Sequence, residues 1–416
     1  MSIPGTTLIK MSWRSLWRNR RRTLLTVSSI ALGTTLSLFF ISMADGMYKK
    51  LIDDAVRMNA GHVTIERREY HRTPSVDLVV PSVSRVKGAA VKVPGVRTIK
   101  PLIQGQAMVS TGSGSVGVSL VGVDPLVEKS LSPIASSIVT GRYLSRSDVR
   151  GVVIGSGLAQ RLDLEPGMKL VLTCNDSTGE LVNEMLRVSG IFTTGMEEAD
   201  GFLIQVNLSV ARRIFQLGPD EATQVGLLLE HPDEQDRVIT ELENVTKQAD
   251  LVVLPWQDVL PDLAGFMAVD KGSNYVFQAI ILFLLSFTIL NTILMSVLER
   301  TREFATLLAI GTSPFLLRIQ VIVESALLGI IGTGIGLVLG GCISYYFQVQ
   351  GLDLRSLFGK NLTITGVLVD PIIRNEVSLH LLLWLGTLVF GLTMIIGLYP
   401  ALRSTRISLP DILRNR

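Results

Sequence analysis

Hydrophobic residues gather in four long runs that hold no charged side chain. The runs cover residues 23–44, 272–298, 325–352 and 377–402, and mixed polar sequence separates them. Each run is longer than the roughly 20 helical residues that cross the hydrocarbon core of a bilayer. Buried helices of soluble proteins rarely stay uncharged over such lengths, so the pattern predicts four membrane-spanning helices.

The first run also follows a basic stretch, as the apolar core of a secretory signal peptide does. Its apolar part exceeds the roughly 7–15 residues of such a core, and the basic stretch before it is unusually long. We therefore interpret the first run as a retained membrane anchor.

Positive charge is distributed unevenly between the two sides of the predicted membrane. The concentrated basic residues are Lys10, Arg14, Arg18, Arg20, Arg21, Arg22, Arg300, Arg302, Arg318, Arg403, Arg406, Arg414 and Arg416. All of them fall on one side, whereas residues 353–376 on the other side carry both signs. Because Lys and Arg accumulate in cytoplasmic loops, the pattern predicts cytoplasmic termini and places residues 45–271 outside. The net charge of +3 conceals this asymmetry.

The spans define the expected organisation, which is a four-helix membrane protein with a large α/β domain inserted between the first and second spans. In chain order we expect an interfacial amphipathic helix (1–22), a span (23–44), a periplasmic core domain (45–271), a span (272–298), a cytoplasmic helix (299–317), a span (318–348), a short periplasmic loop (349–376), a span (377–400) and a cytoplasmic tail (401–416). In the first helix, Trp13, Leu16 and Trp17 share one side, as in helices that lie at a membrane interface.

Residues 45–271 have the composition of a folded α/β domain, built as one lobe or as two. Alternating Val116, Val118 and Leu120 after a turn at 111–115 predict the second strand of a hairpin. Residues 169–173 and 185–192 flank another turn, and a helix is expected from Asp233. The residues Gly155-Ser-Gly157 lack the flanking pattern of a nucleophile elbow and predict a strand-to-helix turn.

Nothing in the chain has the spacing of a catalytic or metal-binding motif. His62, His71 and His231 are scattered, and His62 and Glu66 lie four apart in a strand-like segment. Cys174 and Cys342 cannot make a disulfide framework. The phosphate-binding motif Gly-x-x-x-x-Gly-Lys-[Ser/Thr] is absent from the sequence, so we expect no enzyme activity or bound cofactor in this chain.

The loop between the second and third spans has the pattern of a short amphipathic helix. Phe304, Leu307 and Leu308 form its apolar stripe, Gly311 suits its end, and Ser313 with Pro314 suits the start of a new helix. The helix could lie on the lipid surface or dock into a partner's groove.

Small residues recur at four-residue spacing in two spans. The first span carries Ser29, Gly33 and Ser37, and the third carries Gly332, Gly336 and Gly340. Such spacing allows two helix backbones to approach closely. The partner helix could belong to the same chain or to another subunit.

Several segments of the sequence resemble segments of a known protein family. Residues 299–311, 324–329 and 332–336, with the closing segments 399–403 and 410–414, resemble the C-terminal half of FtsX/MacB-type ABC permeases. The outer segments 61–65, 121–125, 141–144, 151–155 and 190–195 resemble the lipoprotein-releasing (LolC/LolE-like) branch. The linked order of these motifs covers nearly the whole chain.

The resemblance implies a permease dimer in the bacterial inner membrane, driven by two copies of an ATP-binding subunit that holds ATP and Mg. The second permease copy could be a paralogue, although we favour a homodimer. The implied substrate is a lipoprotein, which is extracted and passed to a periplasmic carrier; no nucleic acid is involved. Transmission of mechanical work to a periplasmic enzyme or assembly factor, and export of drugs or peptides, remain alternatives.

The resemblance also assigns roles to residues. The helix that couples to the ATPase would comprise Glu299, Arg300, Glu303, Phe304, Leu307, Leu308 and Gly311. The substrate cavity would be lined by Gly33, Ser37, Phe40, Met43, Phe277, Ile280 and Leu284. A periplasmic partner could contact a loop with Met196, Glu197 and Asp200, although this loop is short for carrier docking. We expect Gly311→Pro or Phe304→Asp to uncouple ATP hydrolysis without unfolding the permease.

Overall fold

The computed structural model describes residues 5–194, 197–246, 250–353, 362–364, 367–369 and 372–403. The chain divides into two compact units. The helical unit comprises residues 1–48, 269–352 and 372–416, and the α/β unit comprises residues 49–268 and 353–371.

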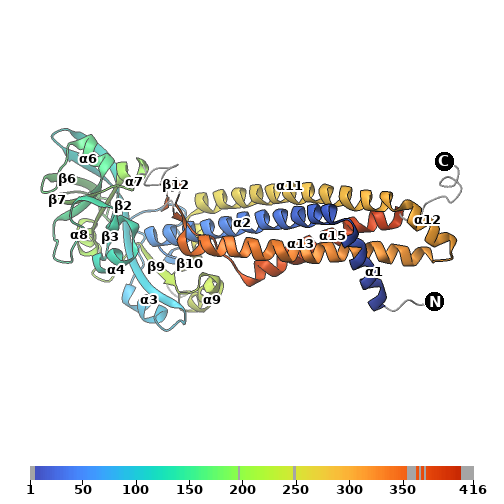
Figure 1. The fold of residues 1–416 in the computed structure, drawn as a ribbon. Coiled ribbons are helices and arrows are strands. Elements are labelled where there is room, and N and C mark those ends of the chain that lie inside the picture. The colour runs from blue at the N-terminus through green and yellow to red at the C-terminus, as the bar shows by residue number, and fades with distance from the viewer. Residues whose placement is uncertain are drawn as a thin grey trace. The chain divides into compact units, whose positions relative to one another are not determined.

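The helical unit is built from a short N-terminal helix, four long helices, and a short helix between the second and third long ones. Its helices are α1 (Gly5–Arg18), α2 (Arg20–Met58), α11 (Pro261–Glu299), α12 (Thr301–Ala309), α13 (Pro314–Gln350) and α15 (Leu379–Arg403). The four long helices α2, α11, α13 and α15 have the length and composition to cross a membrane and run side by side (Figure 1). The predicted membrane fold, with an α/β domain between the first and second spans, is confirmed.

The long helices α2 and α11 extend beyond the apolar runs. Helix α2 continues past residue 44 to Met58, and α11 begins at Pro261 rather than at 272. Polar pairs support the extension of α2, because Lys50 and Asp54 are 3.0 Å apart and Arg57 and Asp53 are 2.9 Å apart at i, i+4 spacing. Hydropathy thus marks the apolar part of each helix and misses its polar end.

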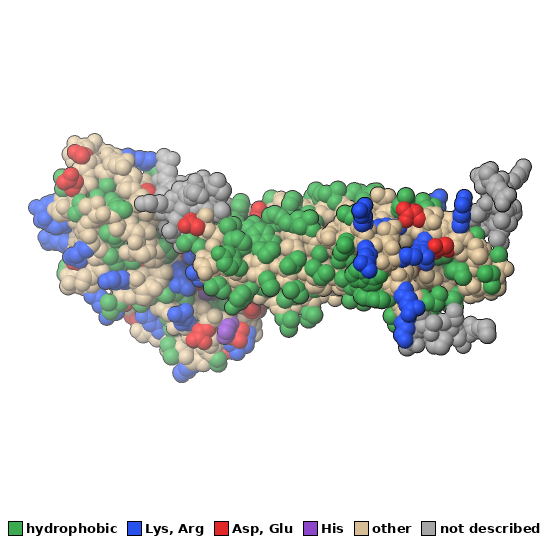
Figure 2. Space-filling view, viewed as in Figure 1, with side chains coloured by type: hydrophobic (Ala, Val, Ile, Leu, Met, Phe, Trp, Pro, Cys, Tyr) green, Lys and Arg blue, Asp and Glu red, His purple; other side chains and the backbone are tan. Residues whose placement is uncertain are grey.

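Side chains of the helical unit are segregated along the helices. Figure 2 shows hydrophobic side chains over the middle of this unit and a group of Lys and Arg side chains toward the end that carries α1 and α12. The exposed basic residues of this end include Arg14, Arg20, Arg21, Arg302 and Arg403. The basic residues of α1 and α12, the first ones of α2 and the last one of α15 therefore lie at one end of the unit.

The α/β unit contains one continuous sheet of ten strands. The strands are β1 (Val63–Arg67), β2 (Val96–Thr111), β3 (Gly114–Val123), β4 (Ile138–Gly141), β5 (Gly151–Gly155), β6 (Lys169–Asn175), β7 (Leu181–Phe192), β8 (Leu203–Asn207), β9 (Gln224–Leu229) and β10 (Leu251–Pro255). Their order is β10-β1-β9-β2-β3-β8-β5-β7-β4, and β6 pairs with β2 and β7. The long strand β2 pairs with β9 through its first half and with β3 through its second, so it joins two parts of the sheet.

Short helices pack around this sheet. They are α3 (Val83–Ala90), α4 (Pro125–Leu131), α5 (Pro133–Ser136), α6 (Ser156–Leu162), α7 (Glu197–Phe202), α8 (Leu208–Ile214), α9 (Gln235–Thr246), α10 (Trp256–Val259) and a 3-10 turn at Pro232–Glu234. Four short strands lie elsewhere: β11 (Leu352–Asp353), β12 (Leu362–Ile364), β13 (Val367–Val369) and β14 (Ile372–Ile373). The predicted hairpins are confirmed as β2–β3 and β6–β7, and Ser156 begins α6 directly after β5, as predicted.

A buried ion pair holds the end of α2 inside the α/β unit. Lys100 on β2 places its Nζ 2.8 Å from Glu128 Oε2 and donates a hydrogen bond of 2.9 Å to the carbonyl of Arg57. Both charged side chains are almost fully buried. Because α2 ends at Met58, Lys100 satisfies a carbonyl of its last turn, where a cation is also favoured by the helix dipole.

Candidate coupling site

The short helix α12 begins and ends where local sequence signals place it. Gly311 has a left-handed backbone with φ of +97°, which suits glycine after a helix end. The amide of Gly311 donates to the Leu308 carbonyl and that of Thr312 to the Leu307 carbonyl, the bonds of a Schellman end. Helix α13 then starts at Pro314, whose fixed φ suits a first helical position. The predicted break is confirmed.

The apolar stripe of α12 faces the helical unit. Phe304 is completely buried in a cluster with Leu16, Leu317 and Val321, and Leu307 and Leu308 pack against the same cluster. A charged side chain at Phe304 would have to enter this core, so we expect Phe304→Asp to destabilise the fold, unlike the expectation from the sequence alone. The stripe attaches α12 to its own chain.

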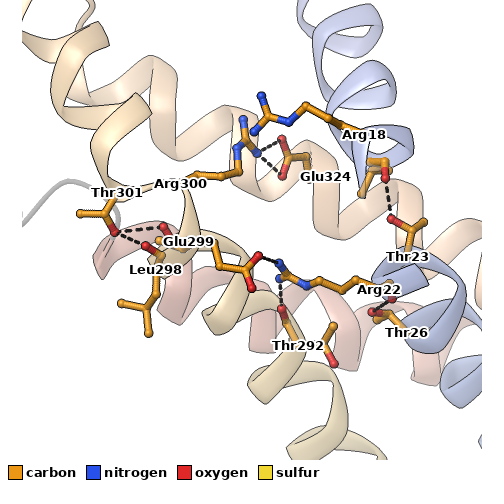
Figure 3. A network of polar contacts seen from close by, with 12 residues as sticks. Arg18, Arg22, Thr23, Thr26, Thr292, Leu298, Glu299, Arg300, Thr301 and Glu324 are labelled. Atoms are coloured by element: carbon orange, nitrogen blue, oxygen red, sulfur yellow. Dashed lines mark hydrogen bonds and ion pairs between the residues drawn. The ribbon is translucent and has the colours of Figure 1, made fainter. Parts of the chain in front are cut away.

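Charged residues at the start of α12 form a network with two other helices (Figure 3). Arg300 donates from Nη1 to both oxygens of Glu324 on α13, at 2.8 and 3.1 Å. Glu303 accepts from Arg18 of α1 at 2.6 Å and from Arg300 at 3.2 Å. Arg300 also lies over the ring of Phe304, 5.0 Å from its centroid. These contacts tie α1, α12 and α13 together.

A second arginine joins α2 and α11 beside this network. Arg22 places Nη1 2.9 Å from Glu299 and donates from Nη2 to the carbonyl of Thr292 (Figure 3). Thr23 donates to the Leu16 carbonyl at 2.6 Å, which fixes the short connection between α1 and α2. A cavity of about 230 Å³ lies among these polar residues.

The electrostatic effect of the network is visible at Glu303. The hydrogen bond from Arg18 is the main cause that lowers the pKa of Glu303 below its ordinary value of 4.5. Arg18 and Glu303 are both substantially exposed, so solvent screens their attraction and the pair contributes little stability. The half-buried Arg300 and the buried Glu324 make the more consequential pair.

The residues beside the turn at Gly311 include exposed apolar side chains that sequence reasoning missed. Ile310 is 78% exposed and Phe315 is 67% exposed, and they flank the turn at Gly311. We call Ile310 and Phe315 the coupling tip. A signal was available, because two large apolar residues bracket a Gly-Thr-Ser-Pro turn and lie off the stripe of α12.

The small-residue stripe of α13 packs against α2 of the same chain. A Cβ atom added at Gly332 would lie 2.7 Å from Ile30 Cβ, and one added at Gly336 would lie 2.6 Å from Thr34 Cβ. At Gly340 the neighbours are Thr35 and Leu38. In this structure the partner helix therefore belongs to the same chain, which decides the alternative that the sequence left open.

The residues predicted to line a substrate cavity lie on α2 and α11, and they do not share one environment. Phe277, Ile280 and Leu284 are exposed on α11, and Phe40 and Met43 are partly exposed on α2. Ser37 is fully buried, and the Gly33 backbone packs against Leu285. The Phe40 and Phe277 rings meet edge to face at 5.5 Å. The exposed members define an apolar face on α11.

The three residues predicted to contact a periplasmic partner differ in where they lie. Met196 lies outside the described residues, and Glu197 begins α7. Asp200 is buried, and its carboxylate accepts hydrogen bonds from the Thr194 amide at 2.7 Å and from the hydroxyls of Thr194 and Thr193. Asp200 thus stabilises its own loop, and its side chain is not a surface group.

His62 and Glu66 each have a structural partner. His62 Nδ1 accepts from the Leu229 amide at 3.2 Å, and Gln224 donates to Glu66 at 2.7 Å. Within the described part of the chain, no group of three His, Cys, Asp or Glu side chains is placed to hold a metal ion.

Two protein families match this chain, one in its N-terminal part and one in its C-terminal part. Residues 23–245 match the family described as the MacB-like periplasmic core domain, and residues 275–409 match the FtsX-like permease C-terminal family. The chain is 24% identical over 405 residues to the lipoprotein-releasing system transmembrane protein LolC of Xylella fastidiosa, with 93% of this chain and 92% of that protein covered.

Two further relatives carry related names. LolC of Neisseria meningitidis serogroup B is 22% identical over 402 residues, with 94% of both chains covered. The lipoprotein-releasing protein LolE of Haemophilus influenzae is 23% identical over 331 residues, covering 77% of this chain and 78% of that protein. The resemblance to this branch, inferred above from short motifs, is confirmed.

Proposed function

The chain belongs to the permease family with a MacB-like periplasmic core domain and an FtsX-like C-terminal region, and from this we propose its function. It is the permease subunit of an ATP-driven ABC transporter that extracts lipoproteins from the inner membrane and releases them toward the outer membrane. The observation that carries this proposal is the similarity to LolC, which spans 93% of the chain and therefore includes both units.

The proposed orientation places both termini in the cytoplasm and the α/β unit in the periplasm. It rests on the exposed arginines at the α1 and α12 end of the helical unit, because basic residues accumulate on the cytoplasmic side. The permease itself carries out no catalytic step in this proposal. ATP and Mg bind to a separate subunit on the cytoplasmic face.

The coupling tip is the surface that we assign to the ATP-binding subunit. Ile310 and Phe315 are exposed and apolar, and the α12 stripe behind them is packed against the helical core. A partner that moves the tip therefore moves a segment that ion pairs join to α1 and α13. Two ATP-binding subunits would act on two permeases, with a second copy of this chain favoured over a paralogue.

The exposed apolar face of α11 is the surface that we assign to the acyl chains of the substrate. Phe277, Ile280 and Leu284 supply hydrocarbon and aromatic surface without a charged group between them. In water such a face would be unfavourable, whereas in a membrane it can contact lipid, acyl chains or another permease. A periplasmic carrier would then receive the released lipoprotein.

The experiment reconstitutes the permease and its ATP-binding subunit in nanodiscs with a triacylated lipoprotein. We expect ATP-dependent release of the lipoprotein and stimulation of ATP hydrolysis when it is bound. Ile310→Asp should abolish release while the permease remains folded. Val139→Asp makes a similar aliphatic-to-acidic change at an exposed position of the α/β unit and should leave release unchanged.

The outcome also separates the alternative functions. Absence of co-purifying lipoprotein, together with ATP hydrolysis that acylated protein does not alter, would overturn the lipoprotein proposal. Mechanical control of a periplasmic enzyme would then be favoured, since it needs the coupling tip but no transported substrate.

A further inference from the structure

A large cavity with a mixed polar and apolar wall lies within the α/β unit, at the place where β2 passes from one part of the sheet to the other. Its volume is about 850 Å³, which falls in the range of sites for drug-sized molecules or short peptide segments. Gln104 and Gln106 on β2 and Gln224 at the start of β9 contribute to its wall. The coupling site and the apolar face of α11 lie in other segments of the chain.

Amide side chains dominate the polar part of the cavity wall. Asn59, Gln104, Gln106 and Asn175 are exposed and line the cavity. Each amide offers both hydrogen-bond donors and an acceptor, so together they complement the alternating donors and acceptors of a peptide backbone. Apolar residues such as Val121 and Leu203 provide the remaining surface.

The charged groups in the wall favour a cation. Glu66 and Asp258 line the cavity, and among the described residues that line it there is no lysine or arginine. A phosphate or carboxylate ligand would meet two acidic groups without an opposing fixed charge. The cavity therefore disfavours anions and favours ammonium or guanidinium groups.

Glu66 is the group best placed to recognise such a cation. Its carboxylate is buried, and its partners are an amide and an imidazole: Gln224 Nε2 at 2.7 Å and His71 Nδ1 at 3.5 Å. Burial raises the pKa of Glu66 above its ordinary value, since no lysine or arginine offsets the loss of hydration. The positive charge of a bound ligand would stabilise the ionised carboxylate of Glu66, which burial otherwise disfavours.

The cavity also contacts both chain connections to the long helices. Met58 ends α2, Asn59 and Ala60 follow it, and Asp258, Val259 and Leu260 precede α11. A ligand in the cavity would therefore touch the segments through which the domain joins its membrane helices.

We propose that this cavity binds an extended polypeptide segment and that Glu66 pairs with a Lys or Arg side chain of the segment. The amides would bind the peptide backbone, and Asp258 would add to the preference for positive charge. This inference goes beyond the proposed function, because it concerns recognition of peptide rather than of acyl chains.

The test measures peptide binding to the full-length permease in nanodiscs, without nucleotide or ATP-binding subunit. The probe is a fluorescein-labelled Gly-Ser-Ser-Lys-Ser-Gly peptide, and its matched control carries norleucine in place of lysine. We expect the lysine peptide to bind roughly tenfold more tightly, the scale of a hydrogen bond to a charged group. Glu66→Gln should remove this preference while leaving the norleucine peptide unaffected.

Two further variants keep the test decisive. Gln106→Arg adds positive charge at an exposed wall position and should weaken the lysine peptide without disturbing the buried Glu66 site. Asp233→Asn removes one exposed negative charge away from the cavity and should change nothing. Equal affinity of the two peptides for the wild-type permease, or no effect of Glu66→Gln and Gln106→Arg, would overturn the proposal. That outcome would leave the proposal of lipoprotein release untouched, so each of the two proposals can fail without the other.

Discussion

Residues 300–315, which join α11 to α13 and include the first residues of α13, present two groups of side chains, which we call the two sides of this segment and which differ in what they contact. On one side, Phe304 is fully buried and Arg300 and Glu303 are paired with residues of α1 and α13. On the other side, Ile310 and Phe315 are largely exposed and apolar. The same short segment thus has a side that attaches it to its own chain and a side that remains available.

This difference separates two roles that amphipathic patterning alone cannot distinguish. An apolar stripe shows which residues share a helix face, and a fixed helix needs such a face for its own attachment. A movable docking surface must instead stay exposed until the partner arrives. Substitutions on the two sides should therefore affect different measurements, and the following predictions run from the largest effect on stability to the smallest.

Phe304→Ala should have the largest effect on stability. Removal of a fully buried aromatic side chain costs about 3–5 kcal/mol, because packing is lost and a cavity remains. The measurement is the free energy of unfolding in detergent by denaturant titration. Phe315→Ala is the matched control and should change it by less than about 0.5 kcal/mol. Similar losses in both variants would erase the distinction between the two sides.

Glu324→Ala should have the next largest effect. It leaves the half-buried Arg300 without its main partner, and loss of one member of a buried pair costs about 3 kcal/mol, reduced here because Arg300 keeps Glu303. The more exposed Glu299 is the control, since Glu299→Ala removes a pair with a largely solvated carboxylate. Equal destabilisation by both substitutions would contradict the importance of the Arg300–Glu324 pair.

Gly311→Ala should cost about 1 kcal/mol through the backbone. The left-handed conformation at φ of +97° disfavours a Cβ atom, although no neighbouring atom stands within 4 Å of its place. Gly334→Ala also meets open space but lies inside helix α13, where alanine is favoured. Thermal unfolding should therefore shift in opposite directions, and a higher unfolding temperature for Gly311→Ala would show that a side chain does not strain the turn.

Arg18→Ala should have the smallest effect, below about 1 kcal/mol, because the pair with Glu303 is exposed. Its pH dependence has a definite sign. The folded-state pKa of Glu303 lies below 4.5, so the stabilisation is present above that pH and is lost as the pH falls through the lowered pKa. The stability difference between wild type and Arg18→Ala should shrink only in that acidic range. A difference that disappears near neutral pH would contradict the assigned ion pair.

Much of the fold could be predicted because its signals are local. Four uncharged runs identified the long helices, and Gly311 with Pro314 located the break between α12 and α13. The polar ends of α2 and α11 were missed because hydropathy reports the membrane environment rather than helix length. Hairpin β2–β3 followed from alternation, whereas the passage of β2 between two parts of the sheet depends on pairing with the distant β9.

The candidate site was only partly predictable, because its side chains are arranged by contacts distant in sequence. Arg18 and Glu303 are 285 positions apart, and no local pattern pairs them. The stripe of Phe304 was recognised, but only the neighbouring helices determine that it is covered. Ile310 and Phe315 were overlooked for the same reason: exposure depends on what the rest of the chain leaves uncovered.

The most direct test of the division between attachment and docking is the affinity of the ATP-binding subunit for the permease in nanodiscs. The comparison is between wild type, the double variant Ile310→Asp/Phe315→Asp, and Arg18→Ala as an exposed variant on the attached side. We predict that the double variant binds at least about tenfold more weakly, since two apolar contacts become charged, and that it unfolds at the wild-type temperature. Arg18→Ala should retain nearly full affinity. Wild-type affinity of a folded double variant would contradict the assignment of the coupling tip as the docking surface.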